Sequence, residues 1–138
     1  MAFIRNKGKT KVVFLPVTAS TVIGKGALVT FSSGLLIAAT SSTVPGALEG
    51  VLVKAIAATD SDYATSGRLV AVEVPVEKHV VWESDVTATL ATTDIGAEVD
   101  LTDSNNVNRG ASSIKIAKCV GFISTVKGLF YLKFGGSY

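Results

Sequence analysis

An alternation of apolar and polar side chains over residues 69–83 is the feature that most constrains the fold of this chain. Successive side chains of a β-strand point to opposite faces, so this period predicts one long strand or a bent pair of strands with one buried face. The apolar face, interrupted only by Lys78, carries Val70, Val72, Val74, Val76, Val80 and Trp82. The opposite face carries Glu73, Glu77, His79 and Glu83 and is expected to be wet or docked against basic groups.

The rest of the chain consists of short apolar runs separated by Gly, Pro, Ser and Asx turns at intervals of roughly 8–12 residues. Residues 27–39 and 114–134 read as hairpins, and the composition is poor in helix formers, with no Gln and one Met. We therefore expect an all-β fold. Residues 12–138 are predicted to form a single-domain β-sandwich or barrel of about eight to nine short, mostly antiparallel strands.

Membrane, disulfide and metal chemistry are not expected. The longest apolar runs, such as residues 51–58, are far shorter than the roughly 18 residues that span a bilayer. No apolar stretch of signal-peptide length follows the first charges, so we expect cytoplasmic synthesis. The single cysteine, Cys119, excludes an intramolecular disulfide, and with His79 alone beside it an ordinary zinc site lacks ligands. No cofactor is predicted.

Charge is segregated into three blocks along the sequence. All eleven acidic residues lie between Glu49 and Asp103, where three basic residues leave a net charge of −8, while residues 1–48 and 104–138 carry +5 each. Complementary patches fix orientation and register, so this pattern favours pairing inside one subunit or between neighbouring subunits. The overall net charge of +2 is too small to predict nucleic-acid binding.

Residues 1–11 are predicted to form an extended basic N-terminal arm. Arg5, Lys7, Lys9 and Lys11 recur at a spacing of two, which in extended backbone places all four on one side. One interpretation is a solvated edge strand whose lysines prevent unwanted pairing. The other is an arm that lies on an acidic neighbour and binds it in a salt-dependent way. Glu73 and Glu77 are the acidic candidates for partner binding.

Catalytic constellations are weak, so we do not expect an enzyme. Glu73 and Glu77 are about 13 Å apart on a strand, beyond the roughly 5–9.5 Å of glycosidase pairs. Glu77 and His79 are better explained as a surface salt bridge. Cys119 lies mid-strand without an activating turn, so we expect a small buried residue.

Two loops and one aromatic residue leave alternatives open. Residues 60–62 begin like a calcium loop but lack its later ligands and glycine, so loop solvation is the default. A second cation candidate, for which turn formation is the default, comprises Asp100, Asp103, Asn105 and Asn106. Trp82 is expected in the core, the alternative being an exposed platform for a sugar or a partner.

Three stretches are similar to segments of the capsid cement, or head decoration, proteins of tailed bacteriophages. These are GKGALVTFSSGLLIAATS at residues 24–41, DIGAEVDLTDSNNVNRG at 94–110 and VGFISTVKGLFYLKF at 120–134. The resemblance covers about a third of the chain and does not include the basic arm. It implies a small β-rich structural protein in the virion, bound to the outside of an assembled capsid at junctions between major capsid subunits.

The resemblance leads us to expect the major capsid protein as partner, with Arg5, Lys7, Lys9 and Lys11 lying over one capsid subunit. A homo-oligomer, either trimer or dimer, is compatible with an edge-rich β domain. The alternative function is a carbohydrate- or host-binding β-sandwich module that uses Trp82, Tyr63 or Tyr131 as stacking platforms.

Overall fold

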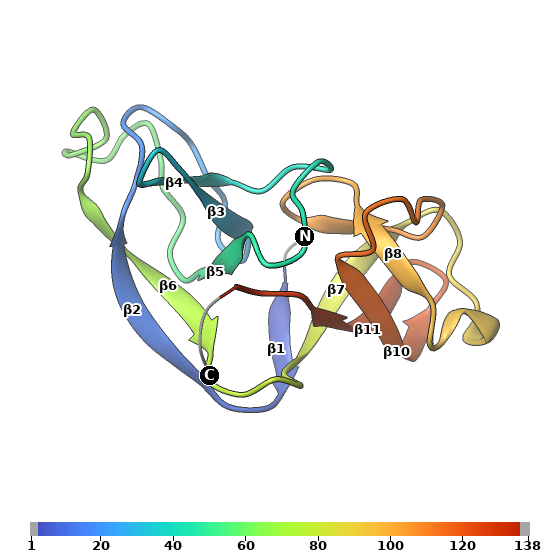
Figure 1. Ribbon diagram of the computed structural model, residues 1–138. Helices are drawn as coiled ribbons and strands as arrows, with labels where there is room; N and C mark the ends of the chain where they lie inside the picture. Colours follow the sequence, from blue (N-terminus) through green and yellow to red (C-terminus); the bar gives the residue numbers. More distant parts are fainter. Residues whose placement is uncertain (1–2, 136–138) are drawn as a thin grey trace.

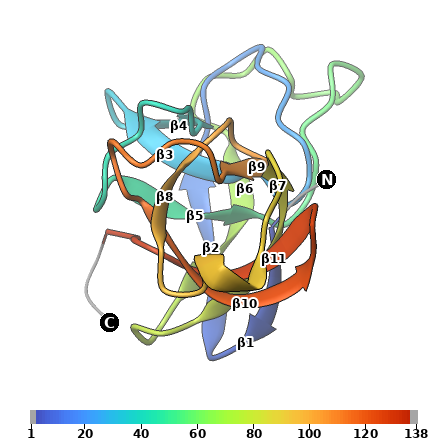
Figure 2. The same ribbon diagram turned by 90° about the vertical axis from the view of Figure 1, so that its right-hand side faces the viewer.

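The computed structural model describes residues 3–135 and is built from β-strands in two sheets (Figures 1 and 2). Among these residues the one short helix is a 3₁₀ turn, η1, at Thr92–Asp94. The strands are β1 Ile4–Lys7, β2 Thr10–Pro16, β3 Leu28–Ser32, β4 Leu35–Ala38, β5 Leu48–Leu52, β6 Leu69–Pro75, β7 Val81–Thr87, β8 Glu98–Leu101, β9 Asn106–Asn108, β10 Ala117–Ser124 and β11 Lys127–Leu132. The predicted all-β fold is therefore confirmed, with more and shorter strands than the eight or nine expected.

The first sheet closes into a ring. Its order is β1-β7-β11-β10-β8-β9, and β9 also pairs in parallel with β7. Strand β7 makes this possible because β1 pairs with its first half and β9 with its second half, both on the side away from β11. Every strand from β7 to β11 is therefore paired on both sides, while β1 is attached outside the ring. The ring lies on the right of Figure 1.

The second sheet is open. Its order is β2-β6-β5-β3-β4, all antiparallel, with β2 at one edge and β4 at the other. The two edges approach only at the end of β2, where Val17 and Leu36 form an isolated bridge. This sheet lies on the left of Figure 1, and β2 runs along its outer side.

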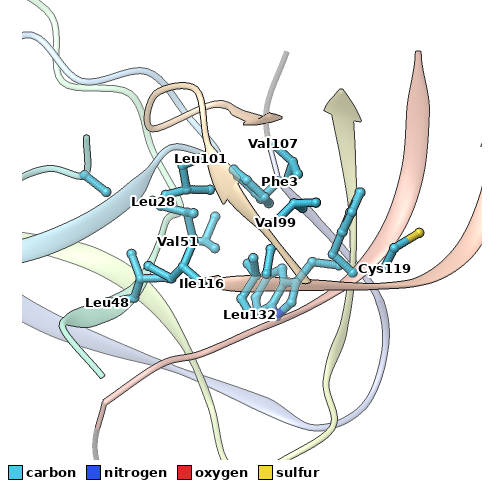
Figure 3. Packing of buried hydrophobic residues seen from close by; sticks show 14 of the residues in the cluster. Phe3, Leu28, Leu48, Val51, Val99, Leu101, Val107, Ile116, Cys119 and Leu132 are labelled. Carbon is cyan, nitrogen blue, oxygen red and sulfur yellow. The ribbon is translucent and has the colours of Figure 1, made fainter. Parts of the chain in front are cut away.

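Two hydrophobic cores share a wall made by β3 and β5. The larger core, inside the ring, contains Trp82 and Phe130, while the smaller one, inside the open sheet, is aliphatic. Leu28 and Val51 point into the larger core (Figure 3), whereas their neighbours Val29 and Leu52 point into the smaller one. Because both faces of the wall are buried, the two sheets pack as one body.

The alternating segment 69–83 is a bent pair of strands, one of the two predicted forms. Its first half is β6 in the open sheet and its second half is β7 in the ring, with Pro75 ending β6. The hairpins predicted for residues 27–39 and 114–134 are present as β3–β4 and β10–β11.

The predicted extended arm is wrong as a description of residues 4–11. Residues 4–7 pair with β7, residues 10–11 pair with β6, and Phe3 is buried in the larger core. The register shifts between Arg5 and Lys7, and Gly8 has a φ of +106°, so the backbone turns. The segment therefore belongs to both sheets, and a single straight basic stripe does not form.

Candidate functional site

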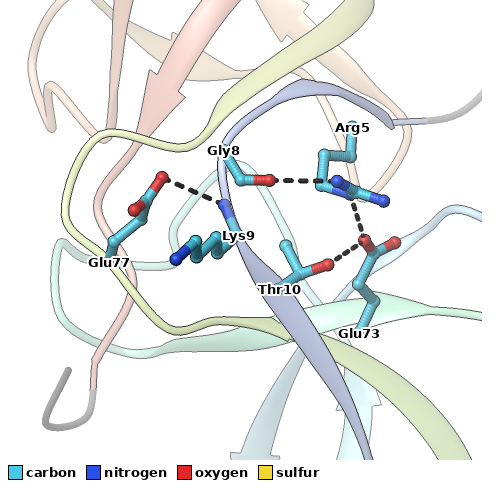
Figure 4. Close-up of polar contacts among 6 residues, drawn as sticks. All are labelled: Arg5, Gly8, Lys9, Thr10, Glu73 and Glu77. Atoms are coloured by element: carbon cyan, nitrogen blue, oxygen red, sulfur yellow. Dashed lines mark hydrogen bonds and ion pairs between the residues drawn. The ribbon is translucent and has the colours of Figure 1, made fainter.

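The turn between β1 and β2 brings the predicted arm residues against the predicted acidic residues (Figure 4). Arg5 Nε lies 3.0 Å from a carboxylate oxygen of Glu73, and Arg5 also donates to the carbonyl oxygen of Gly8 at 3.0 Å. Thr10 donates its hydroxyl to the same Glu73 oxygen at 2.6 Å. The charge pairing expected from the sequence is therefore present inside one subunit for Arg5.

Glu77 fixes the other side of this turn. One of its carboxylate oxygens accepts the backbone N–H of Lys9 at 3.0 Å, so the contact does not use the Lys9 side chain. Glycine is required at position 8, because a Cβ there would lie 2.9 Å from the Cα of Val80 in addition to the positive φ. Glu73 and Glu77 thus have a structural role in holding the turn.

Three cations remain available at this turn. Lys7, Lys9 and Lys11 are exposed, and no ion pair of theirs occurs among residues 3–135. Lys11 belongs to β2 and Lys7 to β1, so the three lie around the turn instead of along one strand face. They form a local positive charge beside the outer edge of the open sheet.

An exposed apolar strip runs along that edge and was not recognised in the sequence. Val12 is 53% exposed, and Phe14 and Leu69 are each 64% exposed. The register places these side chains on the same outer face of β2 and β6, with Phe14 opposite Ala71. The alternate residues Val13 and Leu15 pack on the smaller core, so both faces of β2 carry apolar side chains. Apolar and polar residues therefore do not alternate along β2, and the sequence does not show which face is exposed.

A shallow cleft adjoins the strip. It has a volume of about 360 Å³, and Phe14 and Leu69 line it together with the charged groups of a neighbouring loop. In that loop Arg68 is paired with both Asp60 and Asp62. The N–H of Ala57 and the Arg68 guanidinium hold the pKa of Asp60 below its usual value. Lys54 also lines the cleft, so two cations balance the two aspartates, and this end of the strip is close to neutral, in contrast to the positive end at the turn.

The second cleft, of about 390 Å³, lies beside β11 and contains Lys78, His79, Lys118 and Tyr131 in its lining. The ring of His79 stacks on Tyr131 with centroids 4.9 Å apart, and in the described residues Glu77 and His79 do not form the salt bridge expected from the sequence. Trp82 is fully buried, which confirms the core prediction and removes it as a sugar platform.

The remaining chemical candidates have structural roles. Asp100 is buried and accepts the backbone N–H groups of Ser113, Ile114 and Lys115. Asp103 accepts the N–H of Asn105 within its own turn, as expected for an Asx residue. Within residues 3–135 no group of three or more His, Cys, Asp or Glu side chains is arranged to hold a metal.

Cys119 is buried, as predicted, and burial raises the pKa of its thiol. A raised pKa lowers the thiolate fraction near neutral pH, which disfavours nucleophilic chemistry. In the described part of the chain, no helix is long and apolar enough to cross a bilayer.

No protein-family model matches the sequence, and no curated protein matches it either. The similarity to phage cement proteins therefore stays a prediction from three sequence stretches.

Proposed function

We propose that the protein is a capsid cement protein of a tailed phage, which binds the outer surface of the assembled shell and stabilises contacts between major capsid subunits. The observation that carries this proposal is the surface at the edge of the open sheet. There, exposed Val12, Phe14 and Leu69 form a strip whose Val12 end adjoins the β1–β2 turn, where Lys7, Lys9 and Lys11 have no ion pair among residues 3–135. An apolar strip flanked by charge is the pattern of a protein interaction surface.

Apolar burial supplies most of the affinity in this proposal. Burial contributes about 25 cal/mol for each Å² of apolar surface removed from water, whereas an exposed ion pair contributes about 0–1 kcal/mol. Lys7, Lys9 and Lys11 therefore act mainly on orientation and association rate, and binding weakens as salt is added. Repeated sites on the shell add avidity beyond any single contact.

The proposal assigns the protein to the virion exterior, with the major capsid protein as partner and with no direct role for nucleic acid, a membrane or a catalytic residue. Association of the protein with itself, as a trimer or dimer, is compatible with it. The carbohydrate-binding alternative retains only Tyr63 and Tyr131 as platforms, because Trp82 is buried. Both tyrosines are partly buried, and Tyr131 already stacks on His79.

Co-sedimentation with undecorated capsids of the cognate phage, at low and high salt, tests the function. The informative variant changes Lys7, Lys9 and Lys11 to Ser. Its matched control changes three exposed lysines away from this turn, Lys25, Lys115 and Lys118, to Ser, and so alters the net charge equally. We expect saturable, salt-sensitive binding that is reduced in the first variant and retained in the control.

Equal binding by both triple variants would be consistent with the proposed function but would show that the β1–β2 turn is not part of the interface. An absence of wild-type binding to the capsids would overturn the function. Glycan binding that requires Tyr131 would then support the alternative.

A further inference from the structure

The edge strand β2 has one hydrogen-bonded neighbour, β6, and the direction of its backbone groups follows from two bonds at its ends. Val17 donates its N–H to the carbonyl of Arg68 at 3.0 Å, and Lys9 accepts the N–H of Val76 at 3.1 Å. Both are odd-numbered residues of this segment. Because inward and outward bonding alternates along an antiparallel strand, all odd-numbered residues of β2 point their N–H and C=O groups toward β6.

The even-numbered residues of β2 therefore direct their backbone groups away from the sheet. Val12 and Phe14 each present one N–H and one C=O along the free edge. In the described residues the bridge toward β4 is at Val17, beyond the end of β2, so no strand pairs with the edge at Val12 and Phe14. Pro16, which has no N–H, occupies the next outward position and ends the row of donors.

This row of open backbone groups coincides with the apolar strip. Val12 and Phe14 carry both the outward backbone groups and the exposed side chains, at 53% and 64% exposure. A strand added at this edge gains backbone hydrogen bonds and places its own alternate side chains against an apolar surface, which are the two components of β-strand addition. The edge from the Gly8 turn to Pro16 accommodates a strand of about six residues, or roughly 20 Å.

Charge identifies the occupant. Lysine on an edge strand opposes pairing with neutral or basic strands, including a second copy of this chain. At the other end of β2 the loop charges of Asp60, Asp62 and Arg68 are already paired with one another, so a second copy offers no free acidic row to the lysines. An acidic partner strand, by contrast, is attracted by Lys9 and Lys11.

We infer that β2 accepts an extended segment of the capsid surface as an added strand, and that this segment has alternating apolar side chains and is acidic where it meets Lys9 and Lys11. The inference rests on the proposed function and specifies how the partner is bound. It assigns recognition to main-chain hydrogen bonds from Val12 and Phe14, with the lysines selecting charge.

Amide hydrogen exchange at single-residue resolution tests the inference. In the free protein, the N–H groups of Val12 and Phe14 should exchange quickly and those of Val13 and Leu15 slowly. On addition of undecorated capsids, Val12 and Phe14 should become protected. If capsids bind but leave these two amides unprotected, the cement function stands and strand addition is overturned. Protection that appears at high protein concentration without capsids would instead identify a second copy as the occupant and overturn the assigned partner.

A proline substitution provides the second test. Val12→Pro removes an N–H that points away from β6, so the fold should be retained, and capsid binding should weaken by about tenfold, the loss expected for roughly 1.4 kcal/mol. Val12→Thr is the matched control, because it keeps the N–H and the β-branched shape, and its binding should fall less. Equal binding by the two variants, with unchanged circular dichroism spectra, would overturn the proposed hydrogen bonds. If Val12→Pro unfolds, the exchange experiment on the wild-type protein decides.

Discussion

The ring and the open sheet treat their edges in opposite ways. In the ring, each strand from β7 to β11 is paired on both sides, and the core holds the large aromatic residues Trp82 and Phe130. In the open sheet, β2 is paired on one side, the core is aliphatic, and Phe14 faces solvent. A closed sheet leaves no edge backbone N–H and C=O groups that could pair with another chain, whereas an open edge keeps such groups available for pairing. In the proposed function, the ring supplies stability and the open sheet supplies the contact surface.

The largest predicted effect is on the ring core. Trp82→Ala should lower the free energy of unfolding by about 3–5 kcal/mol, because it removes the largest fully buried side chain and leaves a cavity in the core. Trp82→Phe should cost much less, since the indole N–H has no hydrogen-bond partner among the described residues and its removal leaves no group unsatisfied. Urea denaturation measures both. Similar losses for the two variants would show that the indole N–H is paired in solution.

Gly50 tests the wall between the cores. A Cβ at this position would collide with the carbonyl oxygen of Glu73 and lie close to the side chains of Val72 and Val74, so Gly50→Ala should destabilise by about 1–3 kcal/mol. The control is Gly24→Ala, where the added Cβ meets nothing within 4 Å and φ is not positive, and the expected change is below about 0.5 kcal/mol. Equal stabilities would show that the wall yields to accommodate a methyl group.

The dependence of stability on pH allows one carboxylate from each region to be compared, Asp94 beside the ring and Asp60 beside the open sheet. The Arg109 guanidinium, followed by the N–H of Ala91, lowers the pKa of Asp94 beside the ring, and the N–H of Ala57, followed by Arg68, lowers that of Asp60 beside the open sheet. A lowered pKa contributes stability that is present above the unfolded-state value of about 3.9 and lost as pH falls through the folded value.

Asp94→Asn and Asp60→Asn should each lower the melting temperature near pH 6 and have a smaller effect near pH 2. Melting temperatures across this range measure the difference. A constant difference between wild type and variant at all pH values would contradict the assigned ion pairs.

The smallest stability effect is expected on the exposed strip. Phe14→Ser should change the free energy of unfolding by less than about 0.5 kcal/mol, because the side chain is mostly solvated. The same variant should bind capsids more weakly, since it removes apolar surface from the interface. Denaturation and co-sedimentation are measured on one preparation. A large loss of stability would show that the Phe14 side chain stabilises the fold. The edge of the open sheet would then contribute to stability as the ring does.

Local sequence signals were sufficient for the hairpins and for the buried positions. The turn at residues 32–34 and the short connection after Ser124 join strands that pair with their sequence neighbours, so alternation and turn residues define them. Trp82 and Cys119 were placed in the core correctly because their runs are apolar on one face.

The edge site was not predictable because it depends on distant pairings. β2 pairs with β6, about sixty residues later, and only that pairing determines which side of β2 stays open. The spacing of Arg5, Lys7, Lys9 and Lys11 suggested one straight stripe, but the left-handed φ of Gly8 and the register shift before it redirect the chain. The acidic residues that hold this turn, Glu73 and Glu77, were identified by charge, although their intramolecular contacts were not.

The short connection at Gly8 and Lys9 also has a mechanical consequence. It joins the outermost strand of the open sheet to β1, which is paired to the ring through β7. Tension applied along β2 loads all of its hydrogen bonds to β6 at once, in shear. The same tension is transmitted to the ring through Gly8 and Lys9. A pull across the strand instead opens those bonds one after another. In the proposed function, a shell that stretches parallel to β2 would therefore meet the stiffer response of this protein.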